Sequence, residues 1–337
     1  MSRYKHKIAL IGCGAVAAHH AVSVQNLENA ELIGVYDRSQ ERAKSFAAEH
    51  GIAAYASIEA LLASDAEVVG ICTPSGLHAP LAIQCLHAGK HVLVEKPIAL
   101  TTDDCEAILR AERESGKICA PVSQMRYYDD IQRAKQILDS GVLGKPVLCD
   151  LYMKYYRKPE YYHNSWHGTL AMDGGGALMN QGIHGVDMLH FLFGPITTVS
   201  GIIRTQVHAI EAEDTAVSTV SFANGAIGVI EGTTSVKNGY PRRLEIHCEK
   251  GNMILQENRI FSIDLPGMEI EPPVQGVNSA ADPMNIPYEG HRRQYANLLA
   301  AIDGTEPLFY TAAEAAETVK TILAIYQSSR EERVVRL

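Results

Sequence analysis

Short apolar runs alternate with helical patterns over the first 120 residues of the chain. Apolar residues recur with the helical period at Ala15–Leu27, Ser39–Glu49, Leu77–Ala88 and Thr102–Glu114. Between these segments, strands are expected at Ile8–Ile11, Glu31–Tyr36, Val68–Ile71, His91–Val94 and Ile118–Ala120. Strands that alternate with helices of about 10–15 residues indicate βαβ units and a parallel sheet. We therefore expect a doubly wound α/β domain that covers residues 1–122.

The pattern changes after about Pro121. Helices are expected at Asp129–Ser140 and at Gly174–Phe193, where Gly194-Pro195 is a good stop signal. Strand-like runs with Gly and Asn turns follow at Thr197–Gln206, Asp214–Phe222, Ala226–Thr233, Arg242–His247, Asn252–Leu255 and Ile260–Ile263. No helical pattern separates them, so residues 123–337 are expected to form an α+β domain with a large open, mostly antiparallel sheet.

The end of the chain is expected to add a loop and two helices to this second domain. Residues 264–287 are rich in Pro and Gly and are typical of a surface loop, and helices fit Arg292–Ile302 and Ala312–Ser328. An antiparallel sheet with helices on one face leaves an apolar face, which usually meets another sheet. We therefore expect a homodimer or homotetramer through the C-terminal sheet. The alternative is that solvent or the long loop covers that face.

Composition narrows the class of partner. Lys and Arg total 30 against 39 Asp and Glu, and the net charge of −9 argues against nucleic acid or an anionic membrane as the main partner. No segment approaches the ~20 apolar residues of a membrane span. The apolar run Ile8–Ile11 stops at Gly12 without a cleavage site, so it does not resemble a signal peptide. The seven scattered Cys include no CxxC pair, which favours reduced thiols in the cytoplasm.

A glycine-rich turn follows the first expected strand and opens the first helix. Gly12-Cys13-Gly14-Ala15-Val16-Ala17 matches the dinucleotide fingerprint G-x-G-x-x-G/A, which predicts that Gly12, Gly14, Ala15 and Val16 bind a pyrophosphate. Asp37 ends the second strand, where a carboxylate accepts hydrogen bonds from the adenosine ribose. Asp37 would repel a 2′-phosphate and favours NAD, but Arg38 could pair with that phosphate, so NADP stays possible. The alternative is a generic glycine turn beside a surface Asp.

Two further strand ends point to the same edge of the sheet. Thr73, Pro74 and His78 follow the expected strand at Val68–Ile71, and Glu95-Lys96-Pro97 follows the next one. Ligands of open α/β sheets bind at the carboxyl ends of the strands, so Thr73, Pro74, His78, Glu95 and Lys96 are predicted beside the cofactor. A Lys at this place can bind a reacting hydroxyl and stabilise the alkoxide that develops.

These motifs resemble those of the Gfo/Idh/MocA oxidoreductases, over essentially the whole chain. The resemblance rests on Gly12-Cys13-Gly14, Cys72-Thr73-Pro74 with His78, Glu95-Lys96-Pro97, Gly174-Gly175-Gly176 leading to Gly182-Ile183-His184-Gly185-Val186-Asp187, and Ala324-Ile325-Tyr326-Gln327-Ser328. It implies a Rossmann domain followed by a domain with a large open sheet that builds dimers or tetramers. The implied activity is NAD(P)-dependent oxidation or reduction of sugars, cyclitols or nucleotide-linked sugars.

The resemblance also implies a catalytic pair, because Lys96 matches the motif lysine and His184 the catalytic histidine. The family often has an Asp four residues before that His, where this chain has Asn180. Positions i and i+4 of a helix share a face, and Asn can bind a hydroxyl but cannot take a proton. The acid and base work therefore falls on His184, with Lys96 assisting. Asp187 could orient the His184 ring or cap a polar face, and the triple glycine invites close approach by a ligand or another backbone.

Aromatic residues gather upstream of this helix. Tyr152, Tyr155, Tyr156, Tyr161 and Tyr162 fall within eleven residues, and sugars suit aromatic surfaces with polar tips. The predicted substrate-binding residues are Tyr156, Tyr162, Trp166 and His167, together with Arg126 for a carboxylate or phosphate. The alternative is that alternating Tyr residues form cross-strand packing pairs. No arrangement of His residues supports a metal site.

The sequence therefore predicts an NAD(P)-dependent oxidoreductase. It would transfer a hydride between nicotinamide and a secondary hydroxyl of a sugar, a cyclitol or a sugar derivative. Two alternatives stay open: a glycosidase of the same fold that oxidises its substrate transiently, and a sensor that binds dinucleotide without turnover. The substrate, the direction of the reaction and the choice between dimer and tetramer are not given by the sequence.

Overall fold

The computed structural model describes residues 4–267, 270 and 287–337. The chain divides into two compact units, the first made of Met1–Gln124 with Pro287–Ala316 and the second of Met125–Ile286 with Glu317–Leu337. The segment 287–316, which the sequence-based division placed in the second domain, thus lies in the first unit. Most of the expected loop 264–287 falls outside the described residues.

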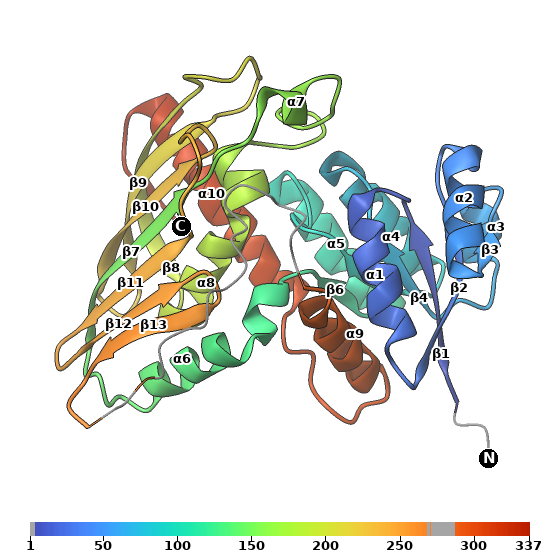
Figure 1. The fold of residues 1–337 in the computed structure, drawn as a ribbon, viewed down its shortest axis with the longest axis horizontal. Helices are drawn as coiled ribbons and strands as arrows, with labels where there is room; N and C mark the ends of the chain where they lie inside the picture. Colours follow the sequence, from blue (N-terminus) through green and yellow to red (C-terminus); the bar gives the residue numbers. More distant parts are fainter. Residues whose placement is uncertain (1–3, 268–269, 271–286) are drawn as a thin grey trace. The chain divides into compact units, whose positions relative to one another are not determined.

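The first unit contains a six-stranded parallel sheet in the order β3-β2-β1-β4-β5-β6 (Figure 1). Its strands are β1 (His6–Ile11), β2 (Ala30–Tyr36), β3 (Ala53–Ala54), β4 (Val68–Ile71), β5 (His91–Val94) and β6 (Cys119–Pro121). Its helices are α1 (Ala15–Gln25), α2 (Gln40–His50), α3 (Ile58–Leu62), α4 (His78–His87), α5 (Thr102–Ser115) and α9 (Glu289–Ile302). This is the doubly wound Rossmann arrangement that the alternating pattern predicts, with two short elements, β3 and α3, that it missed.

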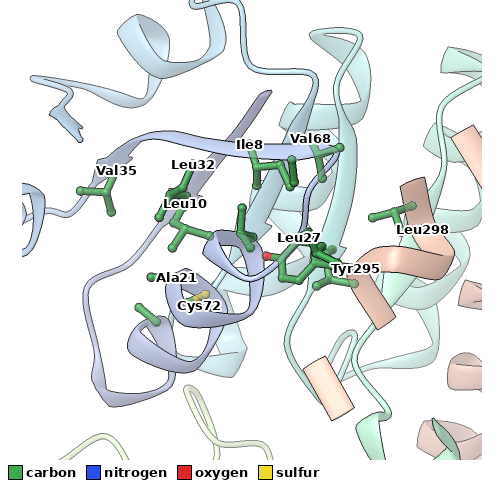
Figure 2. Close-up of a cluster of buried hydrophobic side chains, with 14 of the residues drawn as sticks. Ile8, Leu10, Ala21, Leu27, Leu32, Val35, Val68, Cys72, Tyr295 and Leu298 are labelled. Atoms are coloured by element: carbon green, nitrogen blue, oxygen red, sulfur yellow. The ribbon is translucent and has the colours of Figure 1, made fainter. Parts of the chain in front are cut away.

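The helix α9 belongs to this unit because it completes the core on one side of the sheet. Tyr295 and Leu298 of α9 are fully buried in the same cluster as Leu10, Ala21 and Val68 (Figure 2). Helices α1 and α9 also pack against each other. Burial of large apolar side chains stabilises by about 1.5–3 kcal/mol each, so the unit depends on a segment far along the chain.

The second unit contains an eight-stranded sheet in the order β13-β12-β11-β7-β10-β9-β8-β14. Its strands are β7 (Pro146–Lys154), β8 (Ile196–Arg204), β9 (Thr215–Phe222), β10 (Ile227–Thr233), β11 (Arg243–Cys248), β12 (Asn252–Gln256), β13 (Arg259–Asp264) and β14 (Val335–Arg336). The neighbours β7 and β10 pair in parallel and the other pairs are antiparallel, which confirms the mostly antiparallel sheet.

Among the residues that the structure describes, helices lie against one face of this sheet and none lies on the other (Figure 1). The unit contains α6 (Asp129–Asp139), α7 (Pro159–Tyr162), the π-helical turn η3 (Ala177–Gly182), α8 (Ile183–Phe193) and most of α10 (Ala312–Glu331). Large apolar side chains on the open face are exposed, among them Ile202, Val217, Ile227 and Phe261. No helix of the described chain is long and apolar enough to cross a membrane.

The expected helix over Gly174–Phe193 differs from the observed one in its start and its form. Helical structure begins at Ala177, and its first part is a π-helix in which the Gln181 N–H donates to the Gly176 carbonyl oxygen, five residues back, at 3.2 Å. Gly174 has φ of 74°, a left-handed conformation that interrupts a right-handed helix. The i and i+4 relation expected for Asn180 and His184 therefore spans a junction between π-helical and α-helical backbone.

Candidate active site

The glycine turn after β1 has the geometry of a phosphate-binding turn. Gly12 has φ of 102°, and a Cβ there would lie 2.6 Å from the Cys72 carbonyl oxygen, so no other residue fits. Gly14 precedes α1 as its N-cap and contributes no side-chain hydrogen bond. A helix start without a capping side chain leaves backbone N–H groups that suit a phosphate. Ala15 and Val16 begin this first turn, as the fingerprint predicts.

Asp37 is bound to the glycine turn by its own carboxylate. Its Oδ2 accepts the Cys13 N–H at 2.9 Å, and its Oδ1 accepts the Ser39 N–H at 2.7 Å and Arg42 Nη2 at 2.9 Å. Burial acts to raise the pKa of Asp37, but these hydrogen bonds outweigh it and hold the pKa below its ordinary value. Arg42 was missed by the sequence reasoning; its place in the first turn of the next helix was the available signal. The predicted Arg38 is exposed.

We expect Asp37→Ala to weaken NAD binding by about tenfold to a hundredfold. The carboxylate both offers charge-assisted hydrogen bonds, worth about 1.5–3 kcal/mol each, and fixes the Cys13 backbone. Calorimetric titration with NADH measures the effect, and Arg38→Ala serves as the control that should leave NAD binding nearly unchanged. An Asp37→Ala protein with the wild-type dissociation constant for NAD would contradict the assignment.

His78 connects the two segments that follow β4 and β5. Its Nδ1 lies 2.7 Å from the Pro97 carbonyl oxygen and its Nε2 lies 2.8 Å from the Thr73 carbonyl oxygen, with the ring 1% exposed. Burial lowers the pKa of His78, although both carbonyl contacts oppose this effect. In the structure, the His78 side chain therefore holds these two segments together, whereas the sequence predicted that it contacts the cofactor.

The Glu95 carboxylate likewise points into the protein interior. Its Oε1 accepts hydrogen bonds from His20 Nε2 at 3.0 Å and His291 Nε2 at 3.3 Å, and its Oε2 accepts the Lys96 N–H at 3.1 Å. The Tyr295 hydroxyl lies 2.9 Å from His20 Nδ1. These groups form one buried network of His20, Glu95, His291 and Tyr295 that ties down the backbone at Lys96. The Glu95 side chain thus holds the Lys96 backbone. The sequence predicted a direct contact between Glu95 and the cofactor, but the structure places its carboxylate in this buried network.

Protonation within this network follows from burial and hydrogen bonding. Burial lowers the pKa of His20, so the neutral ring donates through Nε2 and accepts the Tyr295 hydroxyl at Nδ1. Burial alone would raise the pKa of Glu95, but the bonds from His20 and His291 hold it well below its ordinary value. The same three side chains lie within reach of a shared metal ion. The hydrogen bonds of His20 and His291 to Glu95, and of Tyr295 to His20, account for this grouping of side chains, and His291 Nδ1 has no partner among the described residues.

Acid is expected to destabilise the protein through this network. The unfolded chain takes up a proton at His20 below about pH 6.5, whereas the folded state resists it, so stability falls as the pH drops from there. Glu95 adds a further loss below about pH 4.3. His20→Gln keeps an N–H donor and is expected to flatten the slope between pH 6.5 and 5. Urea unfolding at several pH values measures this, with the exposed His163→Gln as control, and an unchanged slope in His20→Gln would count against the network.

In the second unit, the predicted residues Asn180 and His184 lie on η3 and α8, and both are buried with less than a tenth of their surface exposed. The Asn180 side chain hydrogen-bonds Tyr161, and Gln181 Nε2 donates to the Tyr161 hydroxyl at 2.8 Å. Burial raises the pKa of Tyr161 well above its ordinary value, so this hydroxyl stays protonated. Tyr161 is thus a neighbour of Asn180 that the sequence reasoning did not select as a substrate residue.

Arg126 and Asp187 form a buried ion pair within the second unit. Arg126 Nε donates to Asp187 Oδ2 at 2.9 Å and Nη2 donates to Oδ1 at 2.7 Å, and each residue is 2% exposed. The guanidinium carbon also lies 4.9 Å from the centre of the Phe191 ring. This placement engages Arg126 in the interior, contrary to the predicted contact with a substrate anion. Two roles were expected for Asp187, orienting the His184 ring or capping a polar face, and neither included this ion pair with Arg126.

Three of the predicted substrate-binding residues, Tyr162, Trp166 and His167, lie on one aromatic segment, residues 161–167. The His167 ring lies 4.0 Å from Trp166 and 4.2 Å from Tyr161, between ring centres. Tyr162 lies 4.8 Å from the His208 ring and donates its hydroxyl to Thr234 Oγ1 at 3.1 Å. Because Tyr161 contacts both His167 and Asn180, this segment reaches η3, the turn that leads into the helix of His184.

The other three tyrosines of the cluster lie on β7 or just after it. Tyr155 is buried, and Tyr152 packs under the Lys154 ammonium at 4.8 Å from its ring centre. The predicted Tyr156 forms an isolated bridge with Ser235. The Arg157 guanidinium donates through Nε and Nη2 to Gln181 Oε1, at 3.1 and 2.7 Å. The aromatic segment is therefore anchored to η3 by Arg157, just before α7, and by Tyr161 within α7.

Comparison with known proteins assigns the chain to a family. The model for an oxidoreductase family with an NAD-binding Rossmann fold matches residues 6–122, and the model for the GFO/IDH/MocA C-terminal domain matches residues 131–254. A dinucleotide-binding oxidoreductase is the class that this fold and glycine turn define. The chain belongs to the Gfo/Idh/MocA family of oxidoreductases and is an NAD-binding member of it.

Two relatives and one structure illustrate the range of the family. Myo-inositol 2-dehydrogenase of Thermotoga maritima is 24% identical, covering 77% of this chain and 78% of the relative. The NAD(+)-dependent scyllo-inositol 2-dehydrogenase of Bacillus subtilis is 28% identical, covering 74% of this chain and 73% of the relative. The WlbA dehydrogenase of Bordetella pertussis, solved with NADH and UDP-GlcNAcA, has a TM-score of 0.90 at 28% identity and covers 100% of this chain and 99% of its own.

Proposed function

We propose that this oxidoreductase is an NAD-dependent dehydrogenase that acts on a secondary hydroxyl of a sugar, a cyclitol or a sugar derivative. The observation that carries the proposal is the position of Lys96, the second residue after β5, at the carboxyl edge of the dinucleotide-binding sheet, with its backbone N–H bound by Glu95. Bound NAD supplies the hydride acceptor. His184 takes the hydroxyl proton, and the Lys96 ammonium stabilises the oxygen as its negative charge develops.

NAD is proposed over NADP because of Asp37. The carboxylate is ionised and fixed at the end of β2, where it would accept hydrogen bonds from ribose hydroxyls and repel a 2′-phosphate. Arg42 pairs with Asp37 through an exposed guanidinium, which offsets part of that repulsion. The expected result is tighter binding of NAD than of NADP.

A nucleotide-linked sugar acid is the first substrate to test. The Bordetella pertussis protein was solved with UDP-GlcNAcA, and Asn180 replaces the Asp common in the family. The aromatic segment next to Asn180 supplies rings and protonated hydroxyls that suit a sugar. Inositols, the substrates named for two relatives, form the second group to test.

The open face of the second sheet is proposed as a homo-oligomer interface. Ile202 pairs with Val217 across β8 and β9, and both are about half exposed or more. An apolar sheet face of this kind usually packs against a symmetric copy. Sedimentation equilibrium tests this, since a monomer at all concentrations would contradict it. We also propose a cytoplasmic location, supported by seven free cysteines of which five are buried.

A substrate screen tests the proposed function against its alternatives. The protein is incubated with UDP-GlcNAcA, inositols and aryl glycosides, each with NAD and with NADP, and reduced-nicotinamide absorbance and released aglycone are followed. Net NADH formation is the expected result. Release of aglycone without net NADH would indicate the glycosidase, and NAD binding with no reaction in the screen would indicate the sensor.

A further inference from the structure

The helix that carries Asn180 and His184 begins in a cap made by two residues from distant parts of the chain. Glu213 lies in the connection before β9, and Tyr326 lies on α10. The Tyr326 hydroxyl donates to Glu213 Oε1 at 2.8 Å, and both side chains are buried. The Glu213 carboxylate and the Tyr326 hydroxyl therefore form one polar unit inside the second unit of the fold.

Glu213 and Tyr326 together accept hydrogen bonds from four successive backbone N–H groups. Glu213 Oε2 accepts the Gly176 N–H at 3.0 Å, its carbonyl oxygen accepts the Ala177 N–H at 2.9 Å, and its Oε1 accepts the Leu178 N–H at 2.7 Å. The Tyr326 hydroxyl oxygen accepts the next N–H, that of Met179, at 3.3 Å. The first N–H groups of a helix have no partner within it. Here the four from Gly176 to Met179 are satisfied by the Glu213 carboxylate, the Glu213 carbonyl oxygen and the Tyr326 hydroxyl.

Two of the three successive glycines, Gly175 and Gly176, are explained by the same pair. A Cβ on Gly175 would lie 2.2 Å from the Tyr326 hydroxyl, and a Cβ on Gly176 would lie 2.1 Å from the Glu213 carbonyl oxygen. Both distances are shorter than any real contact of a Cβ atom, so these positions need glycine for the cap itself. Of the two possibilities that the sequence left open, close approach by another backbone accounts for Gly176, without any ligand.

The cap directly adjoins the π-helical turn that follows it. The Gly176 N–H is held by Glu213 while the Gly176 carbonyl oxygen accepts the Gln181 N–H, which closes the wide π-helical turn. A π-helical turn rotates the residues within it relative to the α-helix that continues from it. The rotation of Asn180 relative to His184 therefore depends on how the segment 176–179 is held.

We propose that Glu213 and Tyr326 are positioning residues for the reaction, which hold the π-helical turn so that Asn180 and His184 face the same substrate hydroxyl. The inference rests on the proposed function of His184. It explains Gly175, Gly176 and the tyrosine of the closing Ala324–Ser328 motif, which the proposed chemistry leaves unexplained. Glu213 suits this task as a carboxylate because it accepts three donors through two oxygens, whereas Gln would present an NH₂ group to one of them.

Tyr326→Phe tests the proposal with the smallest change to the fold. Loss of the hydroxyl leaves the Met179 N–H without an acceptor, so hydrogen exchange of the segment 176–184 is expected to become about tenfold faster. The value of kcat is expected to fall about tenfold, with a shifted acid limb of the kcat/KM profile and an unchanged dissociation constant for NAD. Glu213→Gln should give larger changes of the same kind. Tyr310→Phe removes another buried tyrosine hydroxyl, just before α10, and should leave kcat and the pH profile at wild-type values.

Two results would overturn the proposal. Exchange at wild-type rates in both Tyr326→Phe and Glu213→Gln would show that the cap does not hold this segment. Faster exchange with unchanged kcat and pH profile would show a cap without influence on the reaction. Hydrogen exchange is measured without substrate, so it tests the cap independently of the reaction. A wild-type protein that turns over no substrate would contradict the proposed function. The exchange rates would still show whether Glu213 and Tyr326 hold the segment 176–184.

Discussion

Replacement of Lys96 by Met is expected to lower kcat by about 10²–10³-fold or more while NAD still binds. Met matches the length of the Lys stem but carries no charge, so it cannot stabilise an oxygen on which negative charge develops. The backbone at Lys96 should keep its place because Glu95 accepts its N–H, a bond that the substitution does not touch. NAD affinity by calorimetry and turnover by nicotinamide absorbance separate the two effects.

The exposed Lys44 of α2 supplies the matched control for this experiment. Lys44→Met also removes one positive charge from the first unit, and turnover should stay at the wild-type level. Turnover retained in Lys96→Met would remove Lys96 from the proposed chemistry. Loss of NAD binding in Lys96→Met, with Lys44→Met normal, would instead make Lys96 a cofactor residue only.

His184→Asn is expected to lower kcat by about 10²–10⁴-fold, the usual contribution of a general base. Asn can still form a hydrogen bond to the substrate hydroxyl but cannot accept its proton. Protonation of a general base produces an acid limb in the kcat/KM profile, and the limb that His184 produces should vanish in this variant. Steady-state kinetics between pH 5 and 9 on the same substrate provide the measurement.

His190 lies on the same helix and provides the control, since its Nε2 contacts Thr321 Oγ1 at 2.9 Å, away from the predicted base. His190→Asn should keep both the rate and the acid limb. An acid limb that persists in His184→Asn would assign the base to another group. Asn180→Asp, which restores the residue common in the family, offers a further check because it adds a group that can take a proton.

The first sheet was predictable because its central strands are buried on both faces. Such strands are continuous apolar runs, and those at Val68–Ile71 and His91–Val94 were predicted with the observed bounds. The strand β7 was not predicted as an element, since Asp150 and Tyr152 interrupt its apolar residues. They point to the partly open face of the sheet, where polar residues are tolerated.

Motif spacing located the parts of the candidate site but not the direction of each side chain. Glu95 and His78 were placed beside the cofactor by their position after strands, yet both side chains point inward. The groups that hold Glu95 lie 75 and 196 residues away in the sequence, at His20 and His291. Partners at such distances leave no periodic signal, and the same holds for the Arg126 and Asp187 pair.

The position of α9 has a consequence for folding during synthesis. Tyr295 and Leu298 fill the core beside α1, and His6 in β1 contacts Asp303 just after α9 at 3.3 Å. The ribosome completes β1 to β6 long before it produces these residues, so the apolar side of the nascent first unit stays uncovered while strands β7 to β13 of the second sheet are made. The unit that begins first is thus finished late, and a chain released before residue 302 would leave a partly folded domain for chaperones and proteases to recognise.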